Sequence, residues 1–556
     1  MNELQVLIGG KAGEGINAAG LTVTHLLNQL GYRMYMYFDY PSLIKGGHNF
    51  CIVRAAGGKI GAHRTKVDFV LAMNQDTIDL HHHRFNEKTV FVFDSDTIKK
   101  DDPVRKDGAG VPVKEILKAE EAPPIMGNTA MIGAFAKTAG FDWSHVEAVL
   151  RKHLPKGIEK NLAVARRSYE MQSEHRAVPR LEGAPMLPVM TGNEAVGLGL
   201  LSAGLEEYVA YPMTPTSNLL HFLAEVSPSF PLTVTHPENE IAVMLMALGF
   251  SYAGKKTAVG TSGGGFCLMT EGFSFAGQAE LPVVVVLGQR TGPSTGLPTY
   301  TGQTELNFAR YAGQGEFPRI IVAPGDAEQA YYWSGITLAL AWKYQVPSII
   351  LVDKTLAEGT YSFDRNDIES QTVEPAAAVQ PSGVYRRYKD TENGVSPGLN
   401  PGAPGAVVKV SSYSHDESGI TTESAQIVDA QTRKRQRKTA SLSAELEGLP
   451  CVKTFGNPGA KTAILCWSSN LGLCTEIAGL FGYRVIQPVV LEPFPVNQFS
   501  KALSGVTGLI SVEDNATGQL SALVSFHGAK VDHRILRYDG RPFTLEELAA
   551  RVKEVA

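Results

Sequence analysis

The sequence of 556 residues lacks the cysteine pattern of a disulfide-linked or metal-cluster protein. It contains five cysteines, and no two of them form a Cys-x-x-Cys pair. Disulfide frameworks, structural zinc sites and iron–sulfur clusters all need paired or clustered cysteines. We therefore expect no metal site within this chain.

Long apolar runs and a large excess of charge are also missing. No run reaches the roughly 18 apolar residues of a membrane helix, and the N-terminus has no basic segment followed by an apolar one, as a signal peptide would. The net charge of −5 is small for this length, which argues against nucleic acid as the main partner. These absences predict a cytoplasmic protein that binds neither nucleic acid nor a membrane.

What the sequence does contain is a series of short apolar runs that alternate with helical patterns. Examples are "QVLIGG", "TVFVFDSD", "PVVVVLGQR", "PSIILVDK" and "GLISVEDN". Continuous apolar strands indicate burial on both faces, which is typical of parallel sheets covered by helices. A chain of this length is also too long to fold around a single hydrophobic core, so several domains are expected. We expect an α/β fold with three parallel-sheet blocks.

Composition suggests where these blocks begin and end. Pro- and Gly-bearing stretches, "RLEGAPMLPVM" and "QPSGVYRRYKDTENGVSPGLNPGAPGAV", interrupt the alternating pattern and argue against regular structure. The predicted division is a first block at 1–175, a linker at 176–191, a second block at 192–362, an irregular segment with a long helix at 363–452, and a third block at 453–556.

Two clusters of charged or titratable residues have mainly structural interpretations. The basic residues at 433–438 lie in the long-helix candidate and point around it. They favour a solvated face, with a phosphate-bearing ligand or an acidic partner surface as the alternative. Adjacent helix residues point about 100° apart, so the three histidines at 81–83 are not expected to chelate a metal together.

The second block holds the residues that suggest chemistry. In "VAYPMTPTSNLL" a proline-stiffened turn follows a predicted strand that ends near Ala210. One interpretation is that Thr216 or Ser217 caps the next helix. The other is that Thr214 hydrogen-bonds an anionic ligand at the carboxyl end of a parallel strand, where sites in α/β proteins lie.

Two carboxylates, Glu238 and Glu240, precede a wholly apolar run at 241–250 that we expect to be buried. Asn239 or Glu238 can cap the helix that begins here, since acids are favoured at a helix N-terminus. Capping does not explain Glu240. A buried carboxylate is costly, so Glu240 should have a partner or a shifted pKa.

Two more stretches follow buried strands. The turn Ser262, Gly263, Gly264 and Gly265 either makes a simple strand-to-helix connection or lets the backbone approach a ligand closely. Arg290 comes directly after "PVVVVLGQ". Its guanidinium is suited to a bidentate grip on a carboxylate or phosphate, and the alternative is a salt bridge within the loop.

Together, "YPMTPTS", "ENEIAVMLMALGFSYAG", "TSGGGFCLMTEG", "LPVVVVLGQRTGPSTGLPT" and "SVEDNATGQL" resemble the α subunit of 2-oxoacid:ferredoxin oxidoreductases. The N-terminal "IGGKAGEGINAAG" and "YPSLIKGGHNF" are similar to the γ subunit of that family. The resemblance covers nearly the whole chain, in the fused γ–α order typical of the 2-oxoglutarate enzymes. It implies a γ domain, a thiamine diphosphate pyrimidine-type domain and a transketolase C-terminal-like domain.

The resemblance also implies roles for individual residues. Glu240 would hydrogen-bond N1′ of the thiamine diphosphate aminopyrimidine and favour the imino tautomer, which takes the proton from C2. Thr214 and Arg290 would hold the substrate carboxylate and act as catalytic residues, with Thr299 and Tyr300 also in the substrate loop. The turn from Ser262 to Gly265 would line the pyrimidine.

Other parts of such an enzyme must come from elsewhere. The Gly-Asp-Gly…Asn motif that holds the Mg²⁺–diphosphate is missing, and "PGDAEQ" is the nearest stretch. The resemblance therefore implies a β subunit that carries Mg²⁺ and a 4Fe–4S cluster, in an (αβ)₂ assembly, with ferredoxin as acceptor and CoA as co-substrate. The amides near Gly13 and Gly15 would face a CoA phosphate, or the same glycines form only a tight strand–helix turn.

Departures from the family pattern leave alternatives open. Tyr300-Thr301-Gly302-Gln303 replaces the frequent Lys-Thr-Glu-Gln, and Ser-Gly-Gly-Gly replaces Ser-Gly-Pro-Gly. The first change admits pyruvate or an aromatic or branched 2-oxoacid instead of the preferred 2-oxoglutarate. Two other functions remain: a non-redox thiamine diphosphate decarboxylase or transketolase-like subunit, and a dinucleotide-binding electron-transfer module. The second lacks the G-x-G-x-x-G spacing.

Overall fold

A computed structural model describes residues 3–42, 47–154, 156–375 and 384–555. Residues 43–46, within the "YPSLIKGGHNF" stretch, lie outside the described residues. The chain forms two compact units. The first contains residues 1–190, 359–364 and 543–551, and the second contains residues 191–358, 365–542 and 552–556.

The first unit is built on a mixed sheet. In the described residues its strand order is β6-β5-β4-β1-β3-β2-β14-β7. The strands are β1 (Glu3–Lys11), β2 (Arg33–Asp39), β3 (His48–Ala56), β4 (Phe69–Ala72), β5 (Val90–Asp94), β6 (Ala109–Val111), β7 (Val189–Thr191) and β14 (Thr360–Ser362). The helices are α1 (Ile16–Asn28), α2 (Gln75–His81), η1 (His82–Arg84), α3 (Val104–Asp107), α4 (Val113–Ala119), η2 (Pro124–Met126), α5 (Gly127–Thr138), α6 (Trp143–His153), α7 (Ile158–Glu170) and α19 (Leu545–Val555).

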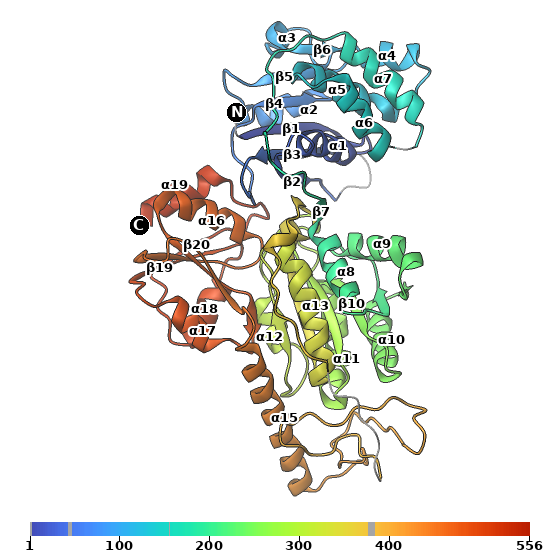
Figure 1. The fold of residues 1–556 in the computed structure, drawn as a ribbon, viewed down its shortest axis with the longest axis vertical. Helices are drawn as coiled ribbons and strands as arrows, with labels where there is room; N and C mark the ends of the chain where they lie inside the picture. The colour runs from blue at the N-terminus through green and yellow to red at the C-terminus, as the bar shows by residue number, and fades with distance from the viewer. Residues whose placement is uncertain (1–2, 43–46, 155, 376–383, 556) are drawn as a thin grey trace. The chain divides into compact units, whose positions relative to one another are not determined.

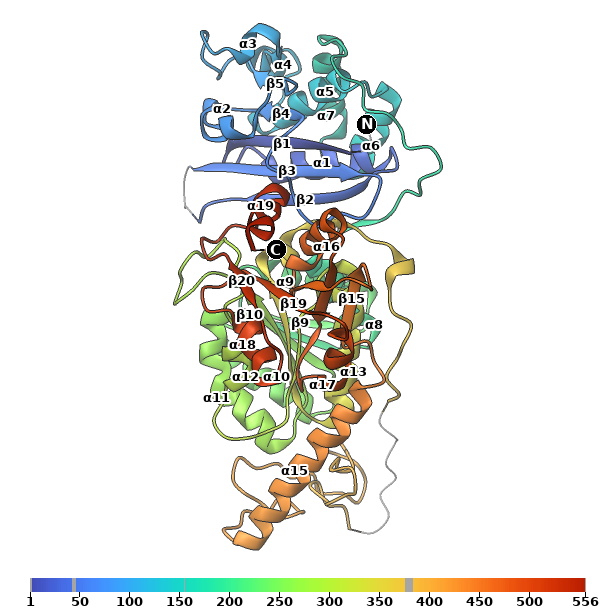
Figure 2. The same ribbon diagram turned by 90° about the vertical axis from the view of Figure 1, so that its left-hand side faces the viewer.

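Strand direction and side-chain alternation explain this sheet. β1 is parallel to β4, but β3 runs antiparallel to both β1 and β2, and these three lie side by side (Figure 2). Successive β1 side chains point to opposite faces. Leu4, Val6 and Ile8 join the larger core, whereas Leu7 joins a smaller one. Both faces are therefore buried, as the continuous apolar runs indicate.

The second unit contains two sheets and most of the informative sequence. In its described part the first sheet has the order β18-β12-β13-β11-β10-β8-β9. The strands are β8 (Glu207–Ala210), β9 (Thr233–Thr235), β10 (Thr257–Ser262), β11 (Val283–Gln289), β12 (Ile320–Val322), β13 (Pro347–Asp353) and β18 (Val490–Glu492). The helices are α8 (Gly192–Ser202), α9 (Ser217–Val226), η3 (Ser227–Ser229), α10 (Glu240–Tyr252), α11 (Gly263–Ala279), α12 (Leu306–Tyr311), α13 (Ala327–Tyr344), α14 (Lys354–Glu358) and η4 (Arg365–Asp367).

The other sheet of this unit has the order β15-β17-β16-β19-β20 in the described residues. Its elements are β15 (Val452–Gly456), β16 (Thr462–Leu465), α16 (Asn470–Phe481), β17 (Arg484–Pro488), α17 (Val496–Ala502), β19 (Gly508–Glu513), α18 (Gln519–Phe526) and β20 (His533–Leu536). The pairs in these two sheets are parallel except β12–β18 and β15–β17. The predicted α/β class with three mostly parallel sheets is confirmed.

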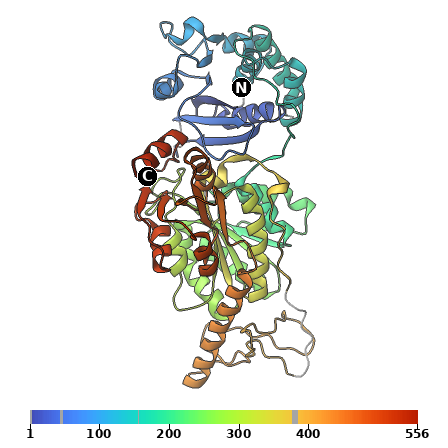
Figure 3. The ribbon, with the colours of Figure 1, turned by 60° about the vertical axis from the view of Figure 1, so that its left-hand side comes forward.

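The long helix α15 (Ala425–Leu446) packs beside the irregular segment at 384–424 (Figures 1 and 3). The contact is close at Gly394, whose φ is +76° and whose added Cβ would lie 2.4 Å from Lys434 O and from Lys438 N. Only a residue without a side chain fits this approach. The Pro- and Gly-rich segment thus covers the helix without forming regular structure.

The prediction of a solvated basic face on this helix is wrong for two of its residues. Lys434 and Lys438 are fully buried, and their Nζ atoms lie 2.8 Å and 2.5 Å from the two carboxylate oxygens of Glu280. Although burial acts to raise it, the pKa of Glu280 is held well below its usual range by Lys438 and Lys434. Arg433, with its side chain 69% exposed, does face solvent. A carboxylate far away in sequence therefore reverses the environment of two of the five basic residues.

No helix among the described residues is long and apolar enough to cross a membrane. The predicted division into five segments stays a prediction.

Candidate functional site

The candidate site in the second unit lies at the carboxyl ends of three neighbouring parallel strands. β10 pairs with β8 through Gly260 and Ala210, and with β11 through Ser262 and Gly288. Thr214 lies in the turn after β8, Ser262 is the last residue of β10, and Arg290 directly follows β11. Carboxyl ends of parallel strands meet at one edge of a sheet, which is where α/β proteins place their ligands.

Arg290 joins the turn after β11 to the turn after β8. Its Nη1 donates hydrogen bonds to the carbonyl oxygens of Thr214, at 3.1 Å, and Pro298, at 3.4 Å. The guanidinium is half-buried, and burial lowers the pKa of Arg290. An arginine keeps its charge over the accessible pH range, so these bonds place a permanent cation at the sheet edge.

The structure also tests whether the neighbouring hydroxyl of Thr216 caps the next helix. Thr216 immediately precedes α9, but its side chain does not cap the helix. Its hydroxyl instead donates to the carbonyl oxygens of Met213, at 3.0 Å, and Thr261, at 3.3 Å. The prediction that Thr216 caps α9 is therefore wrong, because its hydroxyl ties the turn to β10.

Glu240 is the first residue of α10 and is only 5% exposed. The cap of this helix is Asn239, whose Oδ1 accepts a 2.9 Å hydrogen bond from the amide of Ala242. Glu238 is exposed. Asn239 therefore caps the helix, and Glu240 is a buried acid at the N-terminus of an apolar helix.

The glycine turn at the start of α11 brings this acid and a second one together. A Cβ atom on Gly265 would lie 2.8 Å from Oε1 of Glu240 and 2.2 Å from Oγ1 of Thr261. A Cβ on Gly263 would lie 2.8 Å from Oε1 of Glu305. All three distances are shorter than real Cβ contacts, so a side chain at either position would force its neighbours to shift. A Cβ on Gly264, between them, would meet only Ser294 O, at an ordinary contact distance of 4.0 Å.

Ser262 adds an unused polar group beneath this turn. It is fully buried, does not cap α11, and its hydroxyl has no hydrogen-bond partner among the described residues. Most buried polar atoms in folded proteins are paired. A buried hydroxyl left over beside a glycine turn fits a site that a ligand completes.

Glu305 is a site residue that the sequence analysis missed. Burial raises the pKa of its carboxyl to about 8. Oε1 accepts a 2.8 Å hydrogen bond from Oγ1 of Thr304, whereas Oε2 has no partner in the described part of the chain. The available signal is "QTELNFARY", in which an acid directly precedes an apolar helix start, as Glu240 does. The turn thus lies between two buried carboxyl groups.

One face of α10 contradicts the expectation that residues 241–250 are buried. Ile241, Leu245 and Met246 are exposed by 52%, 53% and 38%. Leu268 of α11 is also exposed, by 50%. Exposed apolar residues that gather next to a buried acid are typical of a surface covered by another chain, and periodicity alone cannot distinguish such a face from a core.

The loop after Arg290 contains the two other predicted substrate residues. Thr299 is buried, and the ring of Tyr300 lies 3.7 Å from the guanidinium carbon of Arg541. The amide of Thr301 donates a 3.1 Å hydrogen bond to Gly540 O. Arg541 was also missed, because it lies 240 positions after Thr301 and nothing local in "YDGRPF" marks it.

Gly13 and Gly15 lie in the first unit, in the turn between β1 and α1. Their φ angles are +92° and +74°. A Cβ on Gly13 would meet nothing within 4 Å, whereas one on Gly15 would lie 2.4 Å from Nδ2 of Asn128. Oε2 of Glu14 accepts a 2.7 Å hydrogen bond from the amide of Lys11. Both glycines are therefore needed for a tight turn, and Gly13 also leaves an open approach.

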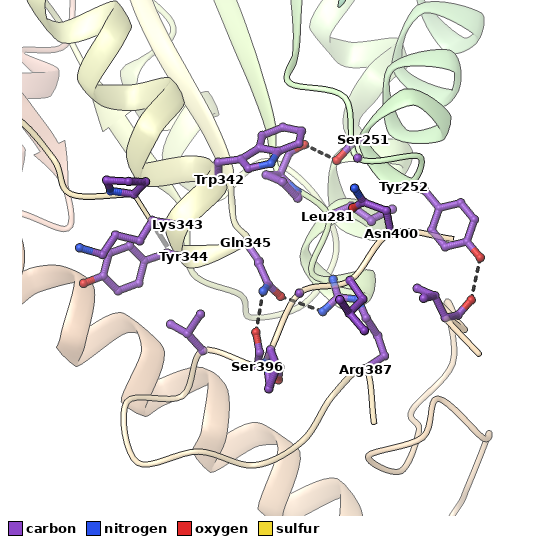
Figure 4. Close-up of a pocket in the computed structure, with 18 of the residues that line it drawn as sticks. Ser251, Tyr252, Leu281, Trp342, Lys343, Tyr344, Gln345, Arg387, Ser396 and Asn400 are labelled. Carbon is purple, nitrogen blue, oxygen red and sulfur yellow. Dashed lines mark hydrogen bonds between the residues drawn. The ribbon is translucent and has the colours of Figure 1, made fainter. Parts of the chain in front are cut away.

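A cavity of about 510 Å³ lies elsewhere in the second unit, between α13 and the segment at 393–400 (Figure 4). Its polar groups are engaged with one another: Nη1 of Arg387 donates to Oε1 of Gln345, whose Nε2 donates to Ser396 O, at 2.7 Å in both cases. None of the predicted site residues lines it. It is separate from the strand-end site.

Comparisons with known proteins agree on one kind of enzyme. Residues 5–171 match the family described as pyruvate ferredoxin/flavodoxin oxidoreductase. Residues 199–434 match pyruvate flavodoxin/ferredoxin oxidoreductase, thiamine diP-bdg. The 2-oxoacid:ferredoxin oxidoreductase subunit alpha of Sulfolobus sp is 29% identical over 607 residues, which cover 98% of this chain and 96% of that protein.

Two further relatives carry more specific names. The 2-oxoglutarate synthase subunit KorA of Archaeoglobus fulgidus is 28% identical and covers 60% of this chain and 89% of its own length. The solved 2-oxoglutarate:ferredoxin oxidoreductase from Magnetococcus marinus, with 2-oxoglutarate, coenzyme A and succinyl-CoA bound, is similar with a TM-score of 0.89 and 28% identity. That match covers 100% of this chain and 99% of the other.

Proposed function

We propose that this chain, a fusion of γ- and α-type domains homologous to the α subunits of 2-oxoacid:ferredoxin oxidoreductases, acts with a β subunit on 2-oxoglutarate. The reaction releases CO₂ from the 2-oxoacid, joins the remaining acyl group to the sulfur of CoA, and passes two electrons to ferredoxin. The product is succinyl-CoA. The preference for 2-oxoglutarate is supported by the relatives whose names carry that substrate.

The observation that carries the proposal is the buried carboxylate of Glu240 beside the glycine turn. Thiamine diphosphate, when bound, supplies the nucleophilic carbon and accepts the electron pair released with CO₂. Glu240 would hold the proton shared with N1′ of the aminopyrimidine. That ring would be lined by the turn from Ser262 to Gly265. The turn lies against the two buried carboxyl groups, since a Cβ at position 263 or 265 would meet one of them.

The substrate would be held by groups from the adjoining strand ends. Arg290 carries a fixed charge, and its hydrogen bonds to Thr214 O and Pro298 O orient the plane of its guanidinium. A planar fork suits a carboxylate better than a flexible ammonium does. The hydroxyls of Thr214 and Thr299 would add hydrogen bonds to the same carboxylate.

A β subunit would supply the diphosphate half of the site. Asp326, in the nearest stretch to a diphosphate motif, already caps α13 by accepting from the amide of Gln329 at 2.8 Å. We assign Mg²⁺ and the 4Fe–4S cluster to β and propose an (αβ)₂ assembly. The exposed face formed by Ile241, Leu245, Met246 and Leu268 adjoins Glu240, which supports β docking there, so that both halves meet at the cofactor.

CoA would bind to the first unit. The turn with Gly13 and Gly15 follows a strand and opens α1, so the first amides of that helix point out of its N-terminus. The open space around Gly13 supports a phosphate there, whereas the carboxylate of Glu14 disfavours one.

The decisive experiment is reconstitution of the chain with its β partner. The complex should release CO₂ from 2-oxoglutarate only when CoA and an oxidised low-potential acceptor are both present, with one succinyl-CoA formed per two electrons transferred. Stoichiometric CO₂ release without acceptor reduction would instead identify a non-redox decarboxylase. No turnover with any 2-oxoacid would reject the proposal altogether.

A further inference from the structure

Glu305 is a buried acid close to Arg290 that does not pair with it. Burial raises the pKa of Glu305 to about 8, although hydrogen bonds from Thr304 and the charge of Arg290 act to lower it. In the described residues the Arg290 guanidinium donates to the carbonyl oxygens of Thr214 and Pro298, not to this carboxyl. An ionised carboxylate beside a guanidinium forms a strong charge-assisted bond. The lack of such a bond indicates that Glu305 carries a proton.

The hydroxyl of Thr304 lies between the two residues. Its Oγ1 is 3.2 Å from the carbonyl oxygen of Arg290 and 2.8 Å from Oε1 of Glu305. A hydroxyl has one hydrogen, and a carbonyl oxygen only accepts. Both contacts are hydrogen bonds at the same time only if the carboxyl of Glu305 supplies a second hydrogen. A protonated Glu305 therefore completes a chain from its own carboxyl through Thr304 to the backbone of Arg290.

The second carboxyl oxygen also favours the neutral form. Oε2 of Glu305 is buried and has no hydrogen-bond partner among the described residues. A carboxylate shares its charge between both oxygens, so ionised Glu305 would leave a charged atom unpaired in the interior, which is costly. The backbone amide of Glu305 donates to Oε1 of Gln289, at 3.3 Å, which fixes the residue against the end of β11.

The elements that surround Glu305 bring one charge to it, that of Arg290 at the end of β11. The first turn of α11, from Gly263 to Phe266, has no titratable side chain, and neither does α18, which packs against α12. Within α12, Arg310 is paired with Glu492 at 3.1 Å. The protonation of Glu305 therefore depends mainly on burial and on Arg290.

Two further buried acids belong to neighbouring elements. Glu240 meets α11 at Gly265, whereas Glu305 meets it at Gly263. These positions lie about 200° apart around the helix. Asp514, at the end of β19, approaches the loop through its backbone amide, which donates to Oε1 of Gln303 at 3.1 Å. Neither acid is among the groups that shift the pKa of Glu305.

We propose that Glu305 is a positioning residue: while neutral, it holds Arg290 through Thr304 and leaves the guanidinium charge to the substrate carboxylate. This inference rests on the proposed function, in which Arg290 binds the carboxylate of the 2-oxoacid. When Glu305 releases its proton to water, the hydrogen of Thr304 turns to the new carboxylate, and the Arg290 carbonyl loses this donor. The carboxylate also neutralises part of the Arg290 charge, so the site binds the 2-oxoacid less tightly.

The test is the pH dependence of KM for 2-oxoglutarate in the complex with β, at saturating CoA. In wild type, KM should rise about fivefold or more between about pH 7 and about pH 9, with a much smaller change in kcat, because a contact made equally in ground and transition states is weakened. In Glu305→Gln the amide cannot ionise and can still donate to Thr304. Its KM should stay within about twofold across the same range.

Three further variants separate this role from a structural one. Glu316→Gln is the matched control, since it makes the same change at an exposed acid of the same unit. It should keep the wild-type rise in KM. Thr304→Val should raise KM at about pH 7 towards the wild-type value at about pH 9, and Thr304→Ser, which retains the hydroxyl, should restore it.

A KM that does not change with pH in wild type, or the same rise in Glu305→Gln, would overturn the inference. Infrared spectra of the chain provide a readout besides activity. The difference between wild type and Glu305→Gln should contain a protonated-carboxyl band at about pH 6 that is lost by about pH 9. Absence of this band would overturn the inference whatever the activity. A complex that turns over no 2-oxoacid although the band is present would count against the proposed function instead.

Discussion

Oε1 of Glu240 lies where a side chain on Gly265 would be, 2.8 Å from the position of the missing Cβ. The acid and the glycine belong to different helices, α10 and α11. Each therefore constrains the other: the carboxylate can remain buried at the sheet edge only while position 265 has no side chain.

The first prediction concerns this contact. Gly265→Ala should destabilise the chain by roughly 1–3 kcal/mol, as overpacking of a filled interior does, because the new methyl group meets both Glu240 and Thr261. Gly264→Ala is the matched control. Its Cβ would have Ser294 O as its nearest neighbour, at 4.0 Å, so no loss is expected. Denaturant unfolding of both variants measures the difference, and equal midpoints would argue against the close contact.

Glu240→Gln should keep the fold and the β contact but lose most turnover. The amide cannot hold the N1′ proton as a carboxylate does, and such acid–base and electrostatic effects are typically worth ~10²–10⁴-fold. Steady-state kinetics of the reconstituted complex give the value. Glu238→Gln, at an exposed neighbouring position, should remain close to wild type. A kcat for Glu240→Gln within a few-fold of wild type would remove Glu240 from the mechanism.

The raised pKa of Glu305 predicts a pH-dependent stability. Burial moves it from 4.5 to about 8, so the unfolded chain releases this proton first as pH rises. The contribution of Glu305 is therefore fully present below about pH 4.5 and is lost as pH rises through about 8. Glu305→Gln should gain stability relative to wild type across that window.

Chemical unfolding of wild type and Glu305→Gln at several pH values between about 5 and 8 tests this. Other groups contribute to the absolute slope: burial, followed by repulsion from Asp353, also raises the pKa of Asp514 to about 8. The difference between the two proteins isolates Glu305. Stability curves that stay parallel would show that Glu305 is ionised in the folded chain.

The isolated chain should bind thiamine diphosphate weakly, because only the pyrimidine half of the proposed site belongs to it. Calorimetry with Mg²⁺ present should give a Kd above roughly 100 μM, since the contacts of the diphosphate are missing. Addition of β should tighten binding strongly. Submicromolar binding by this chain alone would contradict a site divided between two subunits.

Local sequence patterns predicted much of the fold. The continuous apolar runs correspond to β1, β5, β11, β13 and β19. Strands that are buried on both faces have apolar residues at successive positions, so they are easy to recognise in the sequence. The resemblance to 2-oxoacid:ferredoxin oxidoreductases is confirmed by relatives that span nearly the whole chain. The burial of Glu240 followed from an acid placed before an apolar helix.

The features that were missed depend on contacts between distant residues. Lys438 is 158 residues from Glu280, so nothing in the helix sequence reveals that a carboxylate neutralises it. Arg541 lies over Tyr300 from the far end of the chain. The exposure of Leu245 was missed for a different reason: an apolar residue has the same identity whether it faces its own core or a partner.

The apolar face of α10 has a consequence for the cell as well as for the site. Ile241, Leu245 and Met246 are exposed on this chain. A copy of the chain without a partner therefore exposes an apolar surface that chaperones and proteases can recognise. In the proposed assembly, binding of the β subunit would cover that surface and stabilise the chain by mass action. The abundance of this protein should therefore follow the supply of its partner, with unassembled copies degraded first.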